Sequence, residues 1–100
     1  MFGTIGHARP KPGMEAKFDA LMAEWKQTVR PQIPGRFLEL TGTSVTRSGE
    51  AVFLALAQDE ATYRALAENP TQHAFFERLS ALFEGEITWE DVEMEITIND

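Results

Sequence analysis

Patterns typical of strands and helices alternate along this chain in one order, which constrains the fold more than any single motif does. Alternating apolar residues predict strands, apolar residues three or four positions apart predict helices, and Pro and Gly mark the breaks between them. The order is strand, helix, strand, strand, helix, strand, the ferredoxin-like βαββαβ arrangement of the α+β class. The expected elements cover residues 2–8, 14–30, 37–46, 51–58, 59–84 and 87–98.

The first helix follows Lys11-Pro12-Gly13 and ends before Pro31 and Pro34. Its apolar residues recur at helical spacing and form one stripe. The stripe consists of Met14, Phe18, Leu21, Met22, Trp25 and Val29.

The second helical region is expected to begin at Asp59, which can cap a helix through its carboxylate. Asn69-Pro70 interrupts the region, Thr71 can cap a new helix, and Gly85 ends it. In the last strand, Ile87 and Trp89 are out of phase with the alternation from Val92 to Ile98, so we expect a bulge near Glu90-Asp91.

The two middle strands differ in how apolar their faces are. They meet at a turn around Ser48-Gly49, and the strand over 37–46 alternates between leucine and polar residues. The strand over 51–57, Ala-Val-Phe-Leu-Ala-Leu-Ala, is apolar on both faces, as in sheets covered on both sides. A chain of this length cannot supply a second layer, so we expect another copy of the chain to cover the free face. The predicted assembly is a homodimer in which the second copy packs on this face.

Composition restricts the class of protein. One hundred residues predict a single domain over 1–100, and the absence of cysteine excludes disulfides and thiol catalysis. The net charge of -7 argues against binding to nucleic acid or to an anionic membrane surface. The longest apolar run, Ala51 to Ala57, is too short to span a bilayer, and no charged-then-apolar leader opens the chain. We therefore expect a cytoplasmic protein.

Three segments together resemble the antibiotic biosynthesis monooxygenase family over nearly the whole chain. They are Lys11-Pro12-Gly13, Ile33-Pro34-Gly35-Arg36-Phe37-Leu38 and Asn69-Pro70-Thr71-Gln72-His73-Ala74-Phe75-Phe76. The resemblance implies ferredoxin-like halves that pair into a dimeric α/β barrel. Members of the resembled family include cofactor-independent monooxygenases of polycyclic phenols, haem-degrading enzymes and small proteins without a known role. The resemblance therefore implies that this chain is one of these three kinds of protein.

Two histidines are candidates for chemistry. His73 lies where the resembled family often has a histidine, and could remove a phenolic proton because the imidazole titrates near neutral pH. The alternative is a histidine in the first helical turn that is hydrogen-bonded to backbone or solvent. His7 could line a ligand cavity if its strand turns it towards the helices, or could simply have an ordinary hydrogen-bond partner. Nothing in their spacing supports a metal site.

Aromatic side chains provide the candidate ligand-binding residues. A largely apolar pocket with a few polar groups would suit a flat aromatic ligand, although residues at such spacing often form only core. Trp25 and Tyr63 are the best candidates, because each ring also carries a hydrogen-bonding group. The predicted binding set is His7, Trp25, Phe53, Tyr63 and Phe76.

The resemblance favours one branch of activity over another. Haem-degrading members of the resembled family share three residues: an asparagine on the first strand, a tryptophan just after the third strand and a histidine on a helix. Here only His73 can match, since the tryptophan position falls near Ala57 and the first strand has no asparagine. The prediction is therefore a monooxygenase that needs no cofactor and oxidises an electron-rich aromatic such as a polycyclic phenol. The alternative is a dimeric barrel that binds a small molecule without catalysis, or has only a structural role.

Overall fold

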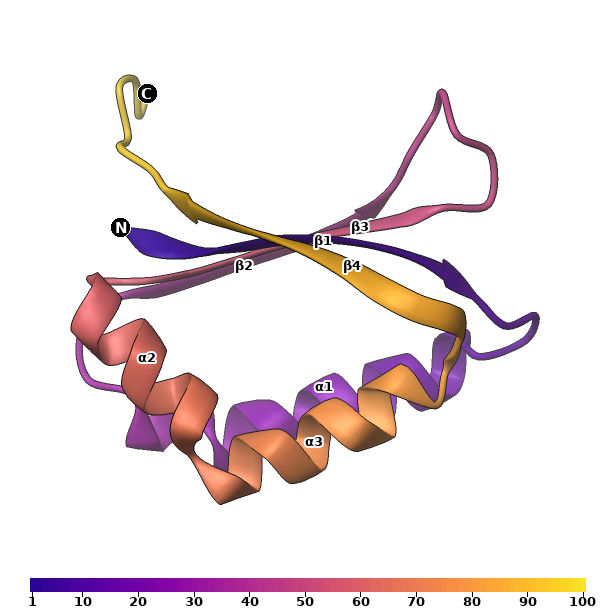
Figure 1. Cartoon of the computed structure of the whole chain (residues 1–100), viewed down its shortest axis with the longest axis horizontal. Helices are drawn as coiled ribbons and strands as arrows, with labels where there is room; N and C mark the ends of the chain where they lie inside the picture. The colour runs from indigo at the N-terminus through magenta and orange to yellow at the C-terminus, as the bar shows by residue number, and fades with distance from the viewer.

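The chain forms a four-stranded antiparallel sheet with all of its helices on one face (Figure 1). The computed structural model describes residues 1–100. Its elements are β1 (Phe2–Pro10), α1 (Glu15–Thr28), a 3-10 turn η1 (Arg30–Gln32), β2 (Phe37–Thr43), β3 (Ala51–Ala57), α2 (Glu60–Glu68), α3 (Pro70–Ser80) and β4 (Phe83–Glu93). None of the helices has the length and apolar character needed to cross a bilayer.

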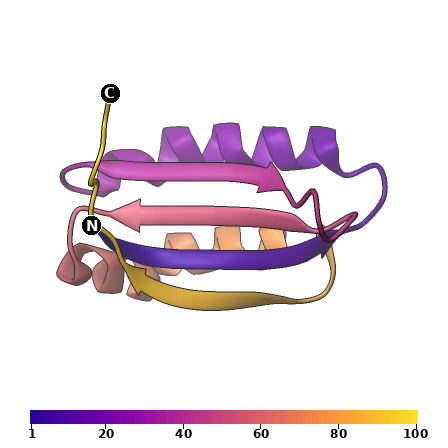
Figure 2. The same ribbon diagram turned by 90° about the horizontal axis from the view of Figure 1, so that it is seen from above.

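The strand order is β2-β3-β1-β4, and each neighbouring pair is antiparallel (Figure 2). The predicted ferredoxin-like fold is therefore confirmed. β1 and β3 occupy the centre of the sheet and β2 and β4 its edges. The β1–β3 ladder runs without interruption from Phe2 opposite Ala57 to Ala8 opposite Ala51.

Two clusters of buried side chains form the core, one on the helix-facing side of the sheet and one among the helices. One joins the three strands β1, β3 and β4 through Ala8, Ala51, Phe53 and Phe83. The other joins α1, the segment after it and α3, and consists of Leu21, Val29, Ile33 and Phe75. The predicted stripe of α1 thus does face the core.

The face of the sheet turned away from the helices is also largely apolar. Cross-strand partners point to the same side of a sheet, and the registers place Leu40, Leu54 and Ile5 side by side on this face. Leu40 is 57% exposed. We call this surface the outer face; its apolar residues are Ile5, Leu38, Leu40, Val52, Leu54, Leu56 and Val92. The prediction that β3 is apolar on both faces is confirmed.

The loop between β2 and β3 and the start of α3 differ from expectation, whereas the start of α2 agrees with it. β2 ends at Thr43, and residues 44–50 form a loop longer than the expected turn, closed by a 2.9 Å hydrogen bond from the Ser44 N–H to the Glu50 carbonyl. Asp59 does cap α2, since its carboxylate accepts a 2.8 Å hydrogen bond from the Thr62 N–H. Thr71 does not cap α3: Asn69 does so, by accepting a 2.8 Å bond from the Thr71 N–H.

The last strand begins and ends earlier than expected. α3 stops at Ser80 and Gly85 lies within β4, where its φ of 67° permits the irregularity between the pairs His7–Thr88 and Arg9–Glu84. No bulge occurs at Glu90-Asp91. Trp89 and Val92 are out of phase because they occupy opposite faces of one regular strand. Residues 94–100 form no strand, and they rise on the side of the sheet opposite the helices (Figure 1).

Phe53 connects these layers, and shortening it should destabilise the protein strongly. Its ring is 6% exposed and packs against Phe18, Phe83 and Trp89 at centroid distances of 6.1, 5.4 and 6.5 Å. Phe53→Ala should lower the free energy of unfolding by about 3–5 kcal/mol, the usual effect of removing a buried ring. Urea denaturation measures this change. Val45→Ala, at a side chain that is 98% exposed, should have almost no effect, and an equally small loss at Phe53 would contradict the proposed core.

Candidate functional site

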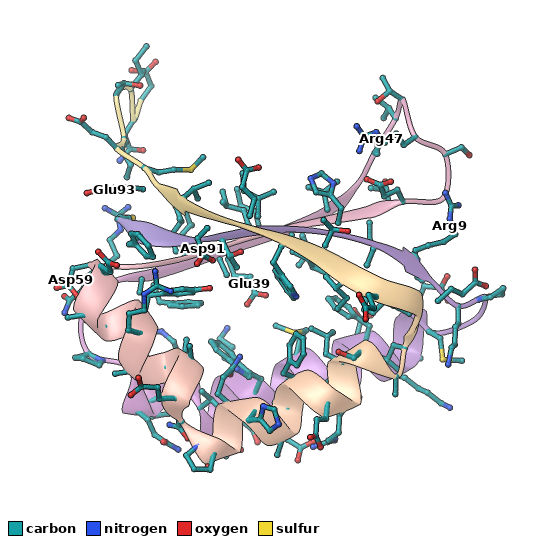
Figure 3. All side chains as sticks on the ribbon, in the orientation of Figure 1. Arg9, Glu39, Arg47, Asp59, Asp91 and Glu93 are labelled. Carbon is teal, nitrogen blue, oxygen red and sulfur yellow. The ribbon has the colours of Figure 1, made fainter.

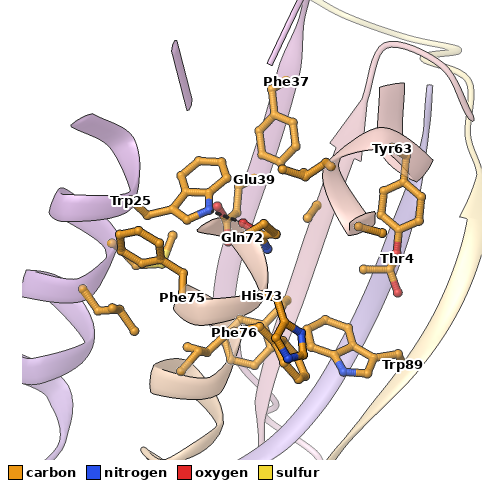
Figure 4. Close-up of a pocket in the computed structure, with 17 residues that line it drawn as sticks. Thr4, Trp25, Phe37, Glu39, Tyr63, Gln72, His73, Phe75, Phe76 and Trp89 are labelled. Atoms are coloured by element: carbon orange, nitrogen blue, oxygen red, sulfur yellow. Dashed lines mark hydrogen bonds between the residues drawn. The ribbon is translucent and has the colours of Figure 1, made fainter. Parts of the chain in front are cut away.

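A cavity of about 390 Å³ lies between the helix-facing side of the sheet and the three helices. Thirteen of the 17 residues that line it are hydrophobic. Figure 4 shows the side chains converging on this space from both layers. The aromatic residues in its wall are Trp25, Phe37, Phe53, Tyr63, Phe75, Phe76 and Trp89. Such a shape and lining suit a flat apolar ligand.

A glycine allows Trp89 to form one side of the cavity. Gly6 lies directly opposite Trp89 in the β1–β4 ladder, and a Cβ atom on Gly6 would come within 2.6 Å of the indole. The ring therefore lies against bare backbone. Phe76 from α3 then packs on Trp89 at 5.9 Å between ring centroids. These contacts connect α3 to the edge strand β4.

A hydrogen bond fixes Trp25 at the opposite side. Its indole N–H donates a 2.7 Å bond to the side-chain oxygen of Gln72 on α3, and its ring packs 5.4 Å from that of Phe37 on β2 (Figure 4). The N–H group of this indole thus already has a hydrogen-bond acceptor within the protein. Trp25 presents mainly its apolar surface to the cavity.

Tyr63 is held by a group of residues at the end of the cavity nearest α2. Its hydroxyl donates a 3.2 Å hydrogen bond to Asp91, which also accepts a 3.3 Å bond from Arg64. Burial raises the pKa of the Tyr63 hydroxyl, and the charge of Asp91 raises it further. Tyr63 is therefore protonated at neutral pH. The nearby Thr4 hydroxyl is also engaged, donating a 3.1 Å bond to the backbone carbonyl of Glu90.

Among the cavity residues that sequence reasoning missed, Glu39 is the one with an ionisable side chain. It lies in the middle of β2 on the helix-facing side (Figure 3), and its carboxyl group forms no hydrogen bond or ion pair with another protein group. Burial among apolar side chains raises its pKa to about 7. A carboxyl group of this kind can exchange a proton near neutral pH.

The alternation in β2 contained the signal for Glu39, but its two faces could be assigned either way. Alternation between leucine and polar residues predicts one apolar and one polar face, and it does not show which of them meets the helices. In the structure Leu38 and Leu40 point to the outer face, whereas Glu39 points under the sheet. A carboxylate on a strand next to the all-apolar β3 could have been singled out as a cavity residue.

His73 lies at the rim of the cavity rather than inside it. Its side chain is 69% exposed, and its Nε2 lies 3.0 Å from a carboxylate oxygen of Glu77, one helical turn further along α3. It therefore combines the two arrangements expected from the sequence, since it borders a cavity and also faces solvent. Its role as a base stays a prediction.

Of the predicted binding residues, Trp25, Phe53, Tyr63 and Phe76 all line the cavity. The expectation that His7 faces the helices is wrong. His7 pairs with Val52 and Thr88 and so points to the outer face, because residues on β1 alternate sides and its neighbours Gly6 and Ala8 face the helices. Its Nδ1 lies 2.9 Å from a carboxylate oxygen of Glu50. No three His, Asp or Glu side chains gather closely enough to hold a metal ion.

Comparison with known proteins supports the fold. No protein-family model matches the sequence, and no curated protein matches it either. A solved structure from Deinococcus radiodurans, provisionally named an antibiotic biosynthesis monooxygenase, superposes with a TM-score of 0.72 at 17% identity, covering 100% of this chain and 98% of its own. One from Caulobacter crescentus with the same provisional name gives 0.74 at 17% identity, covering 94% and 89%.

The same fold also occurs under another name. An uncharacterised NIPSNAP domain protein from Burkholderia xenovorans gives a TM-score of 0.62 at 17% identity, and the match covers 100% of both chains. The resemblance to antibiotic biosynthesis monooxygenases inferred from the sequence is therefore confirmed at the level of the fold. A shared fold does not assign an activity by itself, so function has to be argued from the cavity.

The raised pKa of Glu39 should make stability depend on pH in a defined direction. Between pH 4.5 and about 7 the carboxyl group of the unfolded chain loses its proton while the folded protein retains it. The free energy of unfolding should therefore fall across this window, by about 3 kcal/mol at most, and stay at the lower value above it. Glu39→Gln removes this titration.

We expect Glu39→Gln to be more stable than the wild type at pH 8 and equally stable at pH 4. Urea denaturation at several pH values would measure the difference between the two proteins. Glu95→Gln, a substitution of an exposed carboxylate in the C-terminal segment, should instead follow the wild type. An identical pH dependence in Glu39→Gln and the wild type would mean that Glu39 is solvated.

Proposed function

We propose that the protein is a cofactor-independent monooxygenase that oxidises an electron-rich aromatic small molecule of the polycyclic phenol type with dioxygen. The observation that carries the proposal is the aromatic-lined cavity of about 390 Å³ with an unpartnered, titratable carboxyl group in its wall. The provisional names of the proteins from Deinococcus and Caulobacter support the same class of reaction.

The reaction needs proton transfer and exclusion of water. Removing a proton from an anthrone-type substrate yields an electron-rich anion, which transfers one electron to dioxygen. The resulting radical and superoxide combine into a peroxide. Loss of water then leaves a carbonyl group, so that a CH₂ group and O₂ become C=O and H₂O. The rings of Phe53, Phe76 and Trp89 would keep bulk water from the charged intermediates.

The residue predicted from the sequence to receive the first proton is His73. From the rim it can reach a ligand that protrudes from the cavity and can pass the proton to solvent. Its exposure and its pairing with Glu77 also favour the second candidate function, binding of an aromatic molecule without catalysis. The two candidates share the cavity and differ in whether dioxygen is consumed.

Oxygen uptake with an anthrone-type phenol tests the proposal. The wild type should consume dioxygen faster than the uncatalysed reaction, and Ala55→Phe should abolish this excess because a ring at Ala55 would fill the cavity. His73→Ala should reduce uptake if His73 is the base. Val45→Ala on the distant loop serves as the matched control and should retain the full rate.

Each outcome separates the candidates. Loss of uptake in both cavity and rim variants would support the monooxygenase and the role of His73. Uptake lost only in Ala55→Phe would keep the activity but place the base elsewhere in the wall. Binding of the phenol without uptake above the uncatalysed rate would favour the non-catalytic binder.

We also propose that a second copy of the chain covers the outer face. β3 contributes Val52 and Leu54 to this face, and a strand apolar on both sides is typical of a sheet covered on both sides. The full-length match to the Deinococcus structure supports treating residues 1–100 as the single domain that would pair in this way.

A charge on the outer face should therefore disrupt the dimer without unfolding the monomer. Leu40 is 57% exposed, so Leu40→Glu should leave the circular dichroism spectrum unchanged. Burying that charge between two sheets would be unfavourable, and the variant should sediment as a monomer at a concentration where the wild type is a dimer. Thr43→Glu, at the exposed end of the same strand, is the control. A wild-type protein that sediments as a monomer at micromolar concentration would refute the barrel.

A further inference from the structure

We propose that Glu39 determines which ligand the cavity takes, by accepting a hydrogen bond from the hydroxyl group of a neutral aromatic molecule and repelling aromatic acids. This inference rests on the cavity being the ligand site of the proposed function. It adds to that function the residue that selects neutral phenols and the class of ligand that this residue excludes, aromatic carboxylates.

The other polar side chains of the wall already have protein partners. Trp25 and Gln72 bond to each other, and His73 lies against Glu77. Tyr63 donates to Asp91 and Thr4 to a backbone carbonyl. The Glu39 carboxyl group has no such partner, and it therefore remains available to accept a hydrogen bond from a ligand.

The surroundings of Glu39 leave room for a ring beside the carboxyl group. Its cross-strand neighbour on the same face is Ala55, one of the smallest residues in the wall. Two positions earlier on β2, Phe37 points to the same side and packs with Trp25. A ligand ring lying over Ala55 and against Phe37 would bring a substituent hydroxyl to the carboxyl group. This arrangement pairs an apolar surface for the ring with one acceptor for the hydroxyl.

The charges around the cavity disfavour anionic ligands. No lysine or arginine lines it, so an aromatic carboxylate would have no cationic partner there. It would also lie near the ionised Glu39 in surroundings of low polarity, where repulsion between like charges is strong. A neutral phenol meets neither obstacle, and its O–H can donate to the carboxylate in a charge-assisted bond.

The preference for neutral phenols over aromatic carboxylates should strengthen as Glu39 ionises. Because burial places the pKa of Glu39 at about 7, the carboxyl group is mostly ionised at pH 8 and mostly protonated at pH 6. The other titratable side chains in the wall are Tyr63 on α2, whose pKa is raised and which stays neutral, and His73 on the α3 rim. α1 contributes no titratable side chain to the wall, and neither do β1, β3 and β4.

Three probes of similar size test the inference: naphthalene, 2-naphthol and 2-naphthoate, titrated against the protein by fluorescence at pH 6 and pH 8. At pH 8 the wild type should bind 2-naphthol roughly tenfold more tightly than naphthalene, the usual effect of a hydrogen bond to a charged group. Binding of 2-naphthoate should be at least tenfold weaker than that of 2-naphthol at pH 8. The ratio of the two affinities should be smaller at pH 6.

Two substitutions at Glu39 separate charge from hydrogen bonding. Glu39→Met has similar length but no acceptor, so the preference for 2-naphthol over naphthalene should disappear while naphthalene still binds. Glu39→Gln keeps an acceptor without the charge, so it should retain part of that preference and lose the discrimination against 2-naphthoate. The matched control is Thr41→Val, next along the same face of β2 but outside the cavity wall, and it should behave as the wild type.

The possible failures are distinguishable. Equal affinities of the wild type for all three probes, or a naphthol preference that survives in Glu39→Met, would overturn the role of Glu39 while leaving the cavity as a binding site. Failure of all three probes to bind would overturn the ligand site and the inference together. Retained naphthol selectivity without oxygen uptake would uphold the inference and remove oxidation from the proposed function.

Discussion

The break between α2 and α3 determines where space is left inside this protein. Pro70 cannot donate a backbone hydrogen bond and disfavours helical geometry at Asn69, whose ψ of 121° is extended. The chain therefore bends there: α2 lies under one end of the sheet, whereas α3 runs beside α1 towards the other (Figure 1). The 390 Å³ cavity lies between the helices and the strands above them. The cavity thus follows from the bend that one Asn-Pro pair places between the two helices.

Sequence patterns predicted the elements well and the direction of side chains poorly, for a physical reason. Helical spacing identified the buried stripe of α1 and predicted Trp25 and Phe76 near a ligand because one helix face must meet the sheet. A strand alternates with a period of two, so the pattern separates its faces without showing which one meets the helices. For β2 the apolar face turned outward and Glu39 inward; for β1, His7 turned outward. The register with β3 shows which residues share a face, and contacts such as that between Phe18 of α1 and Phe53 show which face meets the helices.

The carboxyl group of Glu39 is a feature that folding alone does not explain. An apolar residue in its place would pack against Phe37 and Ala55 without the desolvation that raises its pKa to about 7. Sites of this kind, where a group is less stable in its charged form than it would be in water, occur preferentially where proteins bind or transform ligands. Tyr63 differs from Glu39 in this respect, because its hydroxyl already donates a hydrogen bond to Asp91.

The two faces of β2 couple the outer face to the cavity. β2 is an edge strand, held in the sheet only by β3, and the same strand carries Leu40 outward and Glu39 inward. A second sheet packed over Leu40 would hold this edge in place from the side that the chain's own helices do not reach. Because a shift of β2 would move the carboxyl group relative to Ala55 and Trp25, a second copy on the opposite face would influence the geometry of hydrogen bonding in the cavity. In this fold, pairing of two chains would therefore do more than bury apolar surface: it would fix the position of the Glu39 carboxyl group in the cavity.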